Sequence, residues 1–255
     1  MSLAGTGVVA IWHDLLPEAK DEFYEWHNRE HMPERAGIPG FRRGRRFIAL
    51  DSGPEYFNLY EADTVEVLGA QDYLSRLNTP TPWTKQVVAS FRSVARSICH
   101  VVYSDGVGQG ANLMTVRFDV PSAARAEVVK ALRQRVLPPL VDLPGITGVH
   151  LCLADEAISK VETAEKKARS EGTQVPTWIV LVEGCRADYV RSAVDSFVSG
   201  LAALPQAGAT APDTTLYQLE YTRCKRPGAL DKPRLRTAAR RFARIPRGEA
   251  RPVLP

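Results

Sequence analysis

The sequence predicts an α+β fold built from two copies of one βαββαβ unit. Strands of alternating polarity and amphipathic helices follow one another in the same order in both halves. A shift of 105 residues lays "HMPERAGIPGF" (31–41) over "VLPPLVDLPGI" (136–146), which superimposes two prolines and the glycine after the second. The same shift lays "GVVAIWHDL" (7–15) over "NLMTVRFDV" (112–120), with an aspartate at the same place in each. The apolar content of 44% in 255 residues is that of a globular chain.

The two repeats are expected at residues 1–104 and 111–224, joined by a glycine-rich linker at 105–110. A βαββαβ unit forms a four-stranded antiparallel sheet with both helices on one face, so the two sheets can cover each other's open faces. The charged segment 156–174 is expected as a helical insertion on the surface of the second half. In chain order the first repeat gives a strand (8–14), a helix (17–32), strands (43–50 and 55–62), a helical region (64–90) and a strand (94–103); the second gives a strand (112–119), a helix (122–137), strands (148–154 and 177–184), a helical region (186–202) and a strand (214–223).

Charge is distributed unevenly along the chain. Residues 225–255 hold ten basic and two acidic side chains, a net +8, so the preceding 224 residues carry about −4 within the chain's total of +4. We therefore expect no nucleic-acid partner, and interpret 225–255 as an extended arm that packs on the body or joins a second subunit into a homodimer.

Several other classes are disfavoured by composition. The start lacks a basic region followed by an apolar one, and no stretch reaches the roughly 20 apolar residues of a membrane span. We expect a cytoplasmic protein without a membrane partner. The four cysteines match no CxxC pattern, which indicates neither a zinc site nor a disulfide framework.

Histidine occupies positions of the first repeat where the second repeat has apolar residues. In the helix, His27 and His31 correspond to Leu132 and Val136 on the buried stripe; in the first strand, His13 corresponds to Phe118. Burying an imidazole without a hydrogen-bond partner costs on the order of 1–3 kcal/mol, so three such exchanges favour a polar pocket in the first half. Each histidine could alternatively be structural, bonded to a carbonyl or carboxylate.

The stretch "HNREH" also matches H-x-x-E-H, in which two histidines one turn apart share a cation. Pro33 follows so closely that we expect the helix to end there, and only His13 or Glu61 could complete a ligand set. We therefore expect no metal.

The helix "EFYEWHNREHMPERAGIPGF", followed by "RRGRRF" and "YFNLYEAD", carries a family resemblance. It resembles the dimeric α+β barrel superfamily of ferredoxin-like proteins, related to the EthD, muconolactone isomerase and cofactor-free monooxygenase groups, in which W-x4-H-x-P leads to P-G-F. Here these residues are Trp26, His31, Pro33 and 39–41. The resemblance covers 5–104 well and 111–224 in outline. It implies a tandem member whose two halves form one intrachain α+β barrel.

From the residues and this resemblance together, we expect a cofactor-independent enzyme of isomerase, lyase, hydrolase or oxygenase type, acting on an aromatic, lactone or other carbon-acid substrate. His31 is the expected base, with His27 or His13 orienting it or acting as acid. Arg43 or Arg45 is expected to stabilise oxyanion charge. The alternatives are a non-catalytic ligand-binding or assembly barrel, or a metal- or haem-dependent enzyme. The remaining expected substrate-binding residues are Asn58, Tyr60, Trp26 and Tyr24.

Overall fold

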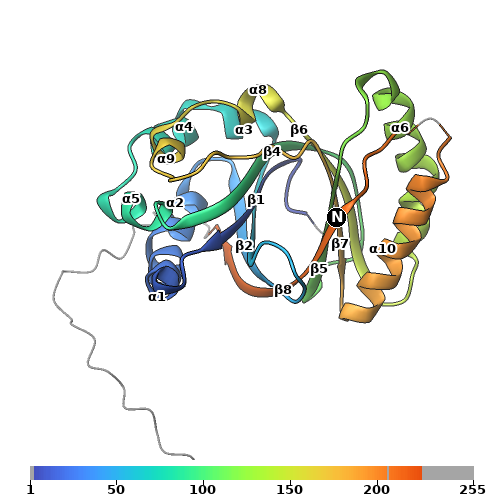
Figure 1. The fold of residues 1–255 in the computed structure, drawn as a ribbon, viewed down its shortest axis with the longest axis horizontal. Helices are drawn as coiled ribbons and strands as arrows, with labels where there is room; N and C mark the ends of the chain where they lie inside the picture. The colour runs from blue at the N-terminus through green and yellow to red at the C-terminus, as the bar shows by residue number, and fades with distance from the viewer. Residues whose placement is uncertain (1–2, 206, 226–255) are drawn as a thin grey trace, which may run out of the picture.

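The computed structural model describes residues 3–205 and 207–225, and within these ranges eight strands close into one antiparallel barrel (Figure 1). The strand order around the barrel is β1-β3-β2-β8-β5-β7-β6-β4. The predicted α+β fold of two ferredoxin-like repeats in one barrel is therefore confirmed. The strands are β1 (Gly7–Leu15), β2 (Phe41–Ala49), β3 (Tyr56–Ala62), β4 (Phe91–Asp105), β5 (Asn112–Phe118), β6 (Ile146–Ala154), β7 (Trp178–Gly184) and β8 (Asp213–Cys224).

Each half contributes four neighbouring strands in the same order, β4-β1-β3-β2 and β8-β5-β7-β6. The barrel closes where the last strand of each half pairs with the second strand of the other half, β8 with β2 and β4 with β6. Because every strand has two neighbours, the barrel leaves no edge strand unpaired. The halves are thus joined by two seams of main-chain hydrogen bonds as well as by the chain between β4 and β5.

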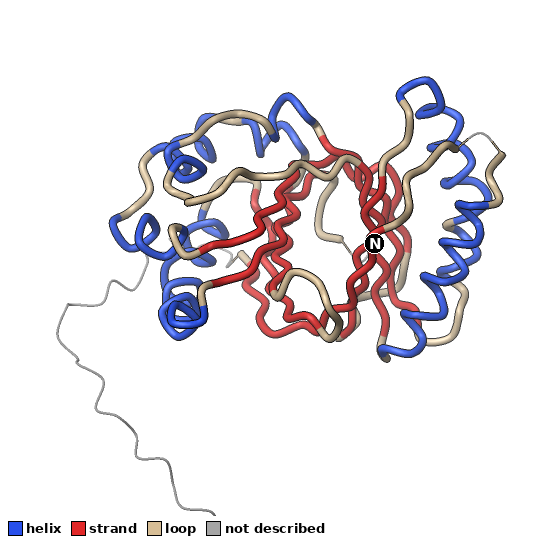
Figure 2. Tube along the Cα trace, in the orientation of Figure 1, coloured by secondary structure: helices blue, strands red, loops and turns tan. Residues whose placement is uncertain are grey.

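The helices stand outside the barrel: those between residues 17 and 88 lie on one side, and those at 122–141 and 187–202 lie on the other (Figures 1 and 2). One apolar core fills the barrel around Trp12, Phe47 and Phe57, and separate cores lie between the sheet and the helices of each half. The helical segments are η1 (Pro17–Ala19), α1 (Lys20–Trp26), η2 (His27–His31), α2 (Met32–Gly37), α3 (Val65–Gly69), α4 (Gln71–Asn78) and α5 (Pro82–Val88), then η3 (Ser122–Ala124), α6 (Arg125–Ala131), η4 (Leu132–Val136), α7 (Pro138–Val141) and α10 (Ala187–Ala202).

Both halves widen their first helix into a π turn at the same place, η2 and η4, again 105 residues apart. The N–H of Met32 bonds the carbonyl of His27, five residues back. Pro33 has no N–H, and its ring would crowd the carbonyl four residues earlier in a regular helix. The wider turn accommodates the proline, so the expectation that the helix ends at Pro33 is wrong: it continues as α2.

The Pro-Gly turn after this helix requires glycine in both repeats. Gly40 and Gly145 have φ values of 83° and 72°, in the left-handed region that side chains disfavour. A Cβ at Gly145 would also lie 2.1 Å from Tyr189. The Pro-Gly pair therefore occurs in both repeats because the backbone of this turn requires glycine.

Residues 156–174, hereafter the strap, do not lie on the second half as expected but cross over the helices of the first (Figure 1). The strap contains α8 (Glu156–Ser159) and α9 (Ala164–Lys167). Its ends are fixed to β4: the N–H of Ile98 donates to Ser159 Oγ at 2.9 Å, and the N–H of Gln174 donates to the carbonyl of Val94 at 2.9 Å. The cause is the β4–β6 seam, since a chain leaving β6 emerges beside the first half.

The basic arm expected at 225–255 falls, beyond Lys225, outside the described residues, so its role in assembly stays a prediction. Among the described residues, no helix has the length and apolar character needed to cross a membrane.

Candidate functional site

The three histidines lie together between the sheet and the first helix of the first half. His13 comes from β1, and His27 and His31 come from η2; their exposed fractions are 0%, 1% and 5%. The rings of His27 and His31 are 5.5 Å apart, and Phe23 lies 5.0 Å from His27 and 5.4 Å from His13. The site is thus a closed layer of imidazoles separated by aromatic rings.

Two of the imidazoles have partners on both nitrogens. Asn58 Nδ2 donates to His13 Nε2 at 3.0 Å, which leaves Nδ1–H to donate to the carbonyl of Asp14 at 3.3 Å. Arg46 Nη1 donates to His27 Nδ1 at 3.0 Å, so Nε2–H of that ring donates to the Tyr60 hydroxyl at 3.1 Å. Both rings are held in one tautomer and one orientation.

His31 differs from the other two. Its Nδ1 is buried and has no hydrogen-bond partner among the described residues. The ring packs 4.3 Å from Trp26 and 5.9 Å from Tyr60. An unsatisfied buried nitrogen is unusual in a folded protein.

All three imidazoles are neutral near pH 7. Burial lowers the pKa of His13 to about 3. Burial also holds the pKa of His27 well below its ordinary value, helped by the charge of Arg46, and that of His31, helped by the charge of Arg35. A neutral imidazole can accept a proton, whereas an imidazolium cannot.

The other residues expected at the site are present with distinct roles in packing. The Tyr60 hydroxyl accepts from His27, and its ring lies 5.9 Å from that of His31. Asn58 donates to His13, while Asn58 Oδ1 has no partner in the described part of the chain. Trp26 donates from Nε1 to Thr84 Oγ1 at 3.1 Å, which fixes the ring against His31.

Tyr24 lies at the rim of this layer. Its hydroxyl donates to Glu220 Oε1 at 2.9 Å, and its ring is 4.5 Å from the guanidinium carbon of Arg46. Tyr24 is only half-buried, so it is the most accessible of the expected residues.

Arg43 and Arg45 do not reach the histidines, which corrects the expected oxyanion arrangement. They point into the barrel, where Arg45 bonds Glu183 at 2.8 and 2.9 Å and Glu61 at 3.0 Å, and Arg43 bonds Glu61 at 2.6 Å. The arginine on the histidine face is Arg46. The cause is a bulge after Phe41, which reverses the alternation of β2 so that Phe41 faces the helices while 43 and 45 face inward.

The strap adds a residue that the sequence did not indicate. Arg169 has a side chain only 4% exposed, and its charge lowers the pKa of both His13 and His31. Its nearest carboxylate, Glu165, also bonds Arg35 of α2 at 2.5 Å. No local pattern places Arg169 here, because the placement depends on the β4–β6 seam. Arg46, in contrast, could have been predicted, because alternation along β2 places it on the opposite face from Arg43 and Arg45.

The H-x-x-E-H stretch is not arranged around a cation. Glu30 accepts hydrogen bonds from the hydroxyls of Thr81 at 2.5 Å and Thr84 at 3.1 Å, while both nitrogens of His27 are taken. Across residues 3–205 and 207–225, no three His, Cys, Asp or Glu side chains are grouped as metal ligands.

The closed barrel, the repeated π-turn helix and the strand order define a tandem ferredoxin-like α+β barrel, which confirms the resemblance at the level of the fold. No protein-family model matches the sequence, and no curated protein matches it. Solved structures do share the fold.

Three of these structures cover most of both chains. An anthrone oxidase-like protein has a TM-score of 0.61 at 14% identity over 90% of this chain and 97% of its own. A protein provisionally named as a monooxygenase from Fusobacterium nucleatum gives 0.55 at 10% identity over 88% and 96%. Another so named, from Lactobacillus acidophilus, gives 0.53 at 9% identity over 86% and 97%. At these identities the similarity describes the fold.

Proposed function

We propose that the first half is a closed acid–base site for a small aromatic substrate, with His31 as the group that takes the proton. The observation that carries this proposal is the buried Nδ1 of His31, which has no partner in the described residues while the nitrogens of His13 and His27 are bonded. A neutral imidazole nitrogen free of protein partners can accept a proton from a phenol or an acidic carbon.

The surrounding groups suit this step. The proton would pass from the substrate to His31 Nδ1, and the resulting anion would offset the charge of the imidazolium. The low pKa of His31, due first to burial and then to Arg35, favours release of the proton at a later step. His27, held by Arg46 and Tyr60, and His13, held by Asn58, act as positioning residues.

Isomerisation, lyase chemistry, hydrolysis and cofactor-free oxygenation can each begin with this proton transfer. Oxygenation of phenols or anthrones, with dioxygen as the oxidant, is the first class to test, because the fold is shared with an anthrone oxidase-like protein and with proteins provisionally named as monooxygenases. Aromatic substrates also suit a wall formed by Phe23, Trp26 and Tyr60.

The test is a panel of phenols, anthrones and lactones, followed by an oxygen electrode and by chromatography of products. For a substrate that is turned over, His31→Ala is expected to lower the rate by roughly 10²–10⁴-fold, the usual contribution of a general base. His100→Ala is the control, since this histidine is exposed on β4. Equal turnover by wild type and His31→Ala would remove His31 as the base.

Two alternatives have separate readouts. Tight binding of panel members with no product from any of them would favour a ligand-binding barrel. A Soret band in the purified protein that is lost in His31→Ala, or a stoichiometric metal by elemental analysis, would favour a haem- or metal-dependent enzyme.

A further inference from the structure

Arg169 of the strap is a buried cation without a full set of partners. Its Nη1 donates to Thr173 Oγ1 at 3.0 Å, while its buried Nε has no hydrogen-bond partner in the described chain. The carboxylate of Glu165 lies 3.8 Å from its Nη2, beyond hydrogen-bond distance. A buried guanidinium normally has a carboxylate at bonding distance, because an uncompensated charge is costly to bury.

Arg35 is a second buried arginine nearby, and it has the carboxylate partners that Arg169 lacks. It bonds the same Glu165 at 2.5 Å and Glu34 at 3.2 Å, and these carboxylates raise its pKa. The pKa of Arg169 is instead lowered, mainly by burial; the charge of Glu165 opposes this shift, and the charges of Arg96 and Arg35 add to it. Glu165 therefore serves mainly Arg35, and Arg169 keeps an N–H donor for another acceptor.

In the described part of the chain, no second carboxylate lies at bonding distance from Arg169. Arg96 of β4 adds a positive charge and donates to the Tyr73 hydroxyl at 3.1 Å. Glu30 is bonded to two threonine hydroxyls. The strap lies against the histidine layer. Ala168, the neighbour of Arg169, packs on the aromatic cluster of Phe23 and Trp26, whose rings contact His13 and His31. The charge of Arg169 also lowers the pKa of both histidines.

We propose that the histidine site binds a small aromatic anion, a carboxylate or phenolate, with Arg169 as its charge partner. The inference rests on the proposed function for the location of the site, but it concerns binding and does not require turnover. The second half would thereby contribute a specificity residue to the site in the first half.

The test uses benzoate as the anionic probe and benzamide as its neutral counterpart, with calorimetric titration of the full chain. Wild type is expected to bind benzoate and to prefer it over benzamide. Arg169→Gln is expected to weaken benzoate about tenfold or more, the factor for losing one charge-assisted hydrogen bond, and to leave benzamide unchanged. Cyclohexanecarboxylate reports whether the ring itself is recognised.

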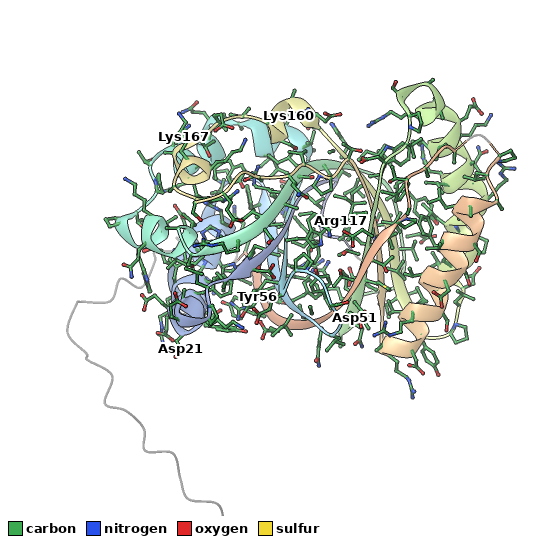
Figure 3. The ribbon with its side chains drawn as sticks, in the orientation of Figure 1. Asp21, Asp51, Tyr56, Arg117, Lys160 and Lys167 are labelled. Carbon is green, nitrogen blue, oxygen red and sulfur yellow. The ribbon has the colours of Figure 1, made fainter. Side chains whose placement is uncertain are left out.

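Lys167→Gln is the matched control. It removes the same charge two residues earlier in the strap, but Lys167 is exposed on the outer surface (Figure 3). This variant is expected to bind benzoate as wild type does. Arg169→Lys, which keeps the charge without the planar fork, is expected to fall between wild type and Arg169→Gln.

A second measurement separates loss of binding from loss of folding. Because Arg169 is a poorly compensated buried charge, Arg169→Gln without ligand is expected to melt at or above the temperature of wild type. Equal benzoate affinity in Arg169→Gln and Lys167→Gln, or no preference for benzoate over benzamide, would overturn the proposal. Failure of the proposed base would appear differently, as benzoate binding that depends on Arg169 together with turnover that does not depend on His31.

Discussion

Replacing His31 by leucine is expected to stabilise the protein. The substitution keeps a similar volume and removes the buried Nδ1 that has no partner among the described residues, which costs about 1–3 kcal/mol. It also loses the ring contact with Trp26 at 4.3 Å, a contribution of about 0.5–1.5 kcal/mol. The net expectation is a gain of about 1 kcal/mol, or about 3 °C in melting temperature for a chain of this size.

The assay is urea and thermal denaturation of wild type, His31→Leu and His13→Leu side by side. His13 is a matched control because it is equally buried but hydrogen-bonded on both nitrogens. His13→Leu leaves the Asn58 amide without its acceptor and is expected to lower stability by about 1–3 kcal/mol. If His31→Leu lowered stability as much as His13→Leu does, the premise that His31 lacks a partner would be refuted.

Three further outcomes are expected. The three imidazoles have pKa values below the unfolded value, so the unfolded chain binds more protons in acid. The contribution of these three groups to the free energy of unfolding should be fully present above about pH 6.5 and should fall by up to about 4 kcal/mol per pH unit below it. In urea titrations at several pH values, His31→Leu should reduce this slope by about 1.4 kcal/mol per pH unit, the share of one proton. Arg45→Met removes the cation that binds two carboxylates inside the barrel, and should lower the free energy of unfolding by about 3–5 kcal/mol in chemical denaturation. Arg42→Met, at an exposed ion pair, should change it by less than about 1 kcal/mol. Equal effects of the two variants would contradict a buried ion cluster. A thiol reagent should label Cys185 and Cys224 in the native protein and the two buried cysteines only after unfolding, and a uniform rate for all four would argue against this packing.

The fold could be predicted because its signals are local and occur twice. The 105-residue offset relates the first two strands of each half, the Pro-Gly turns at Gly40 and Gly145, and the two π turns; beyond the strap the last two strands are offset by 122 residues. The offset also predicted which histidines are buried, because Leu132 is completely buried at the position equivalent to His27.

The missed features depend on contacts distant in the chain or on irregular backbone. The bulge after Phe41 decides which arginines of β2 enter the barrel, and regular alternation cannot indicate a bulge. The strap reaches the first half because β6 pairs with β4, and this pairing forms only when the barrel closes. Arg169 is therefore outside the reach of any single stretch of sequence.

The covalent link between β4 and β5 allows the two halves of the barrel to differ in sequence. In a barrel of two identical chains, any substitution made in one half appears in the other, and a strap would have to cover both faces. Here the second half keeps Phe118 and Leu132 as ordinary core and lends its strap to its neighbour. Joining the halves allows one of them to keep an apolar core while the other buries three histidines.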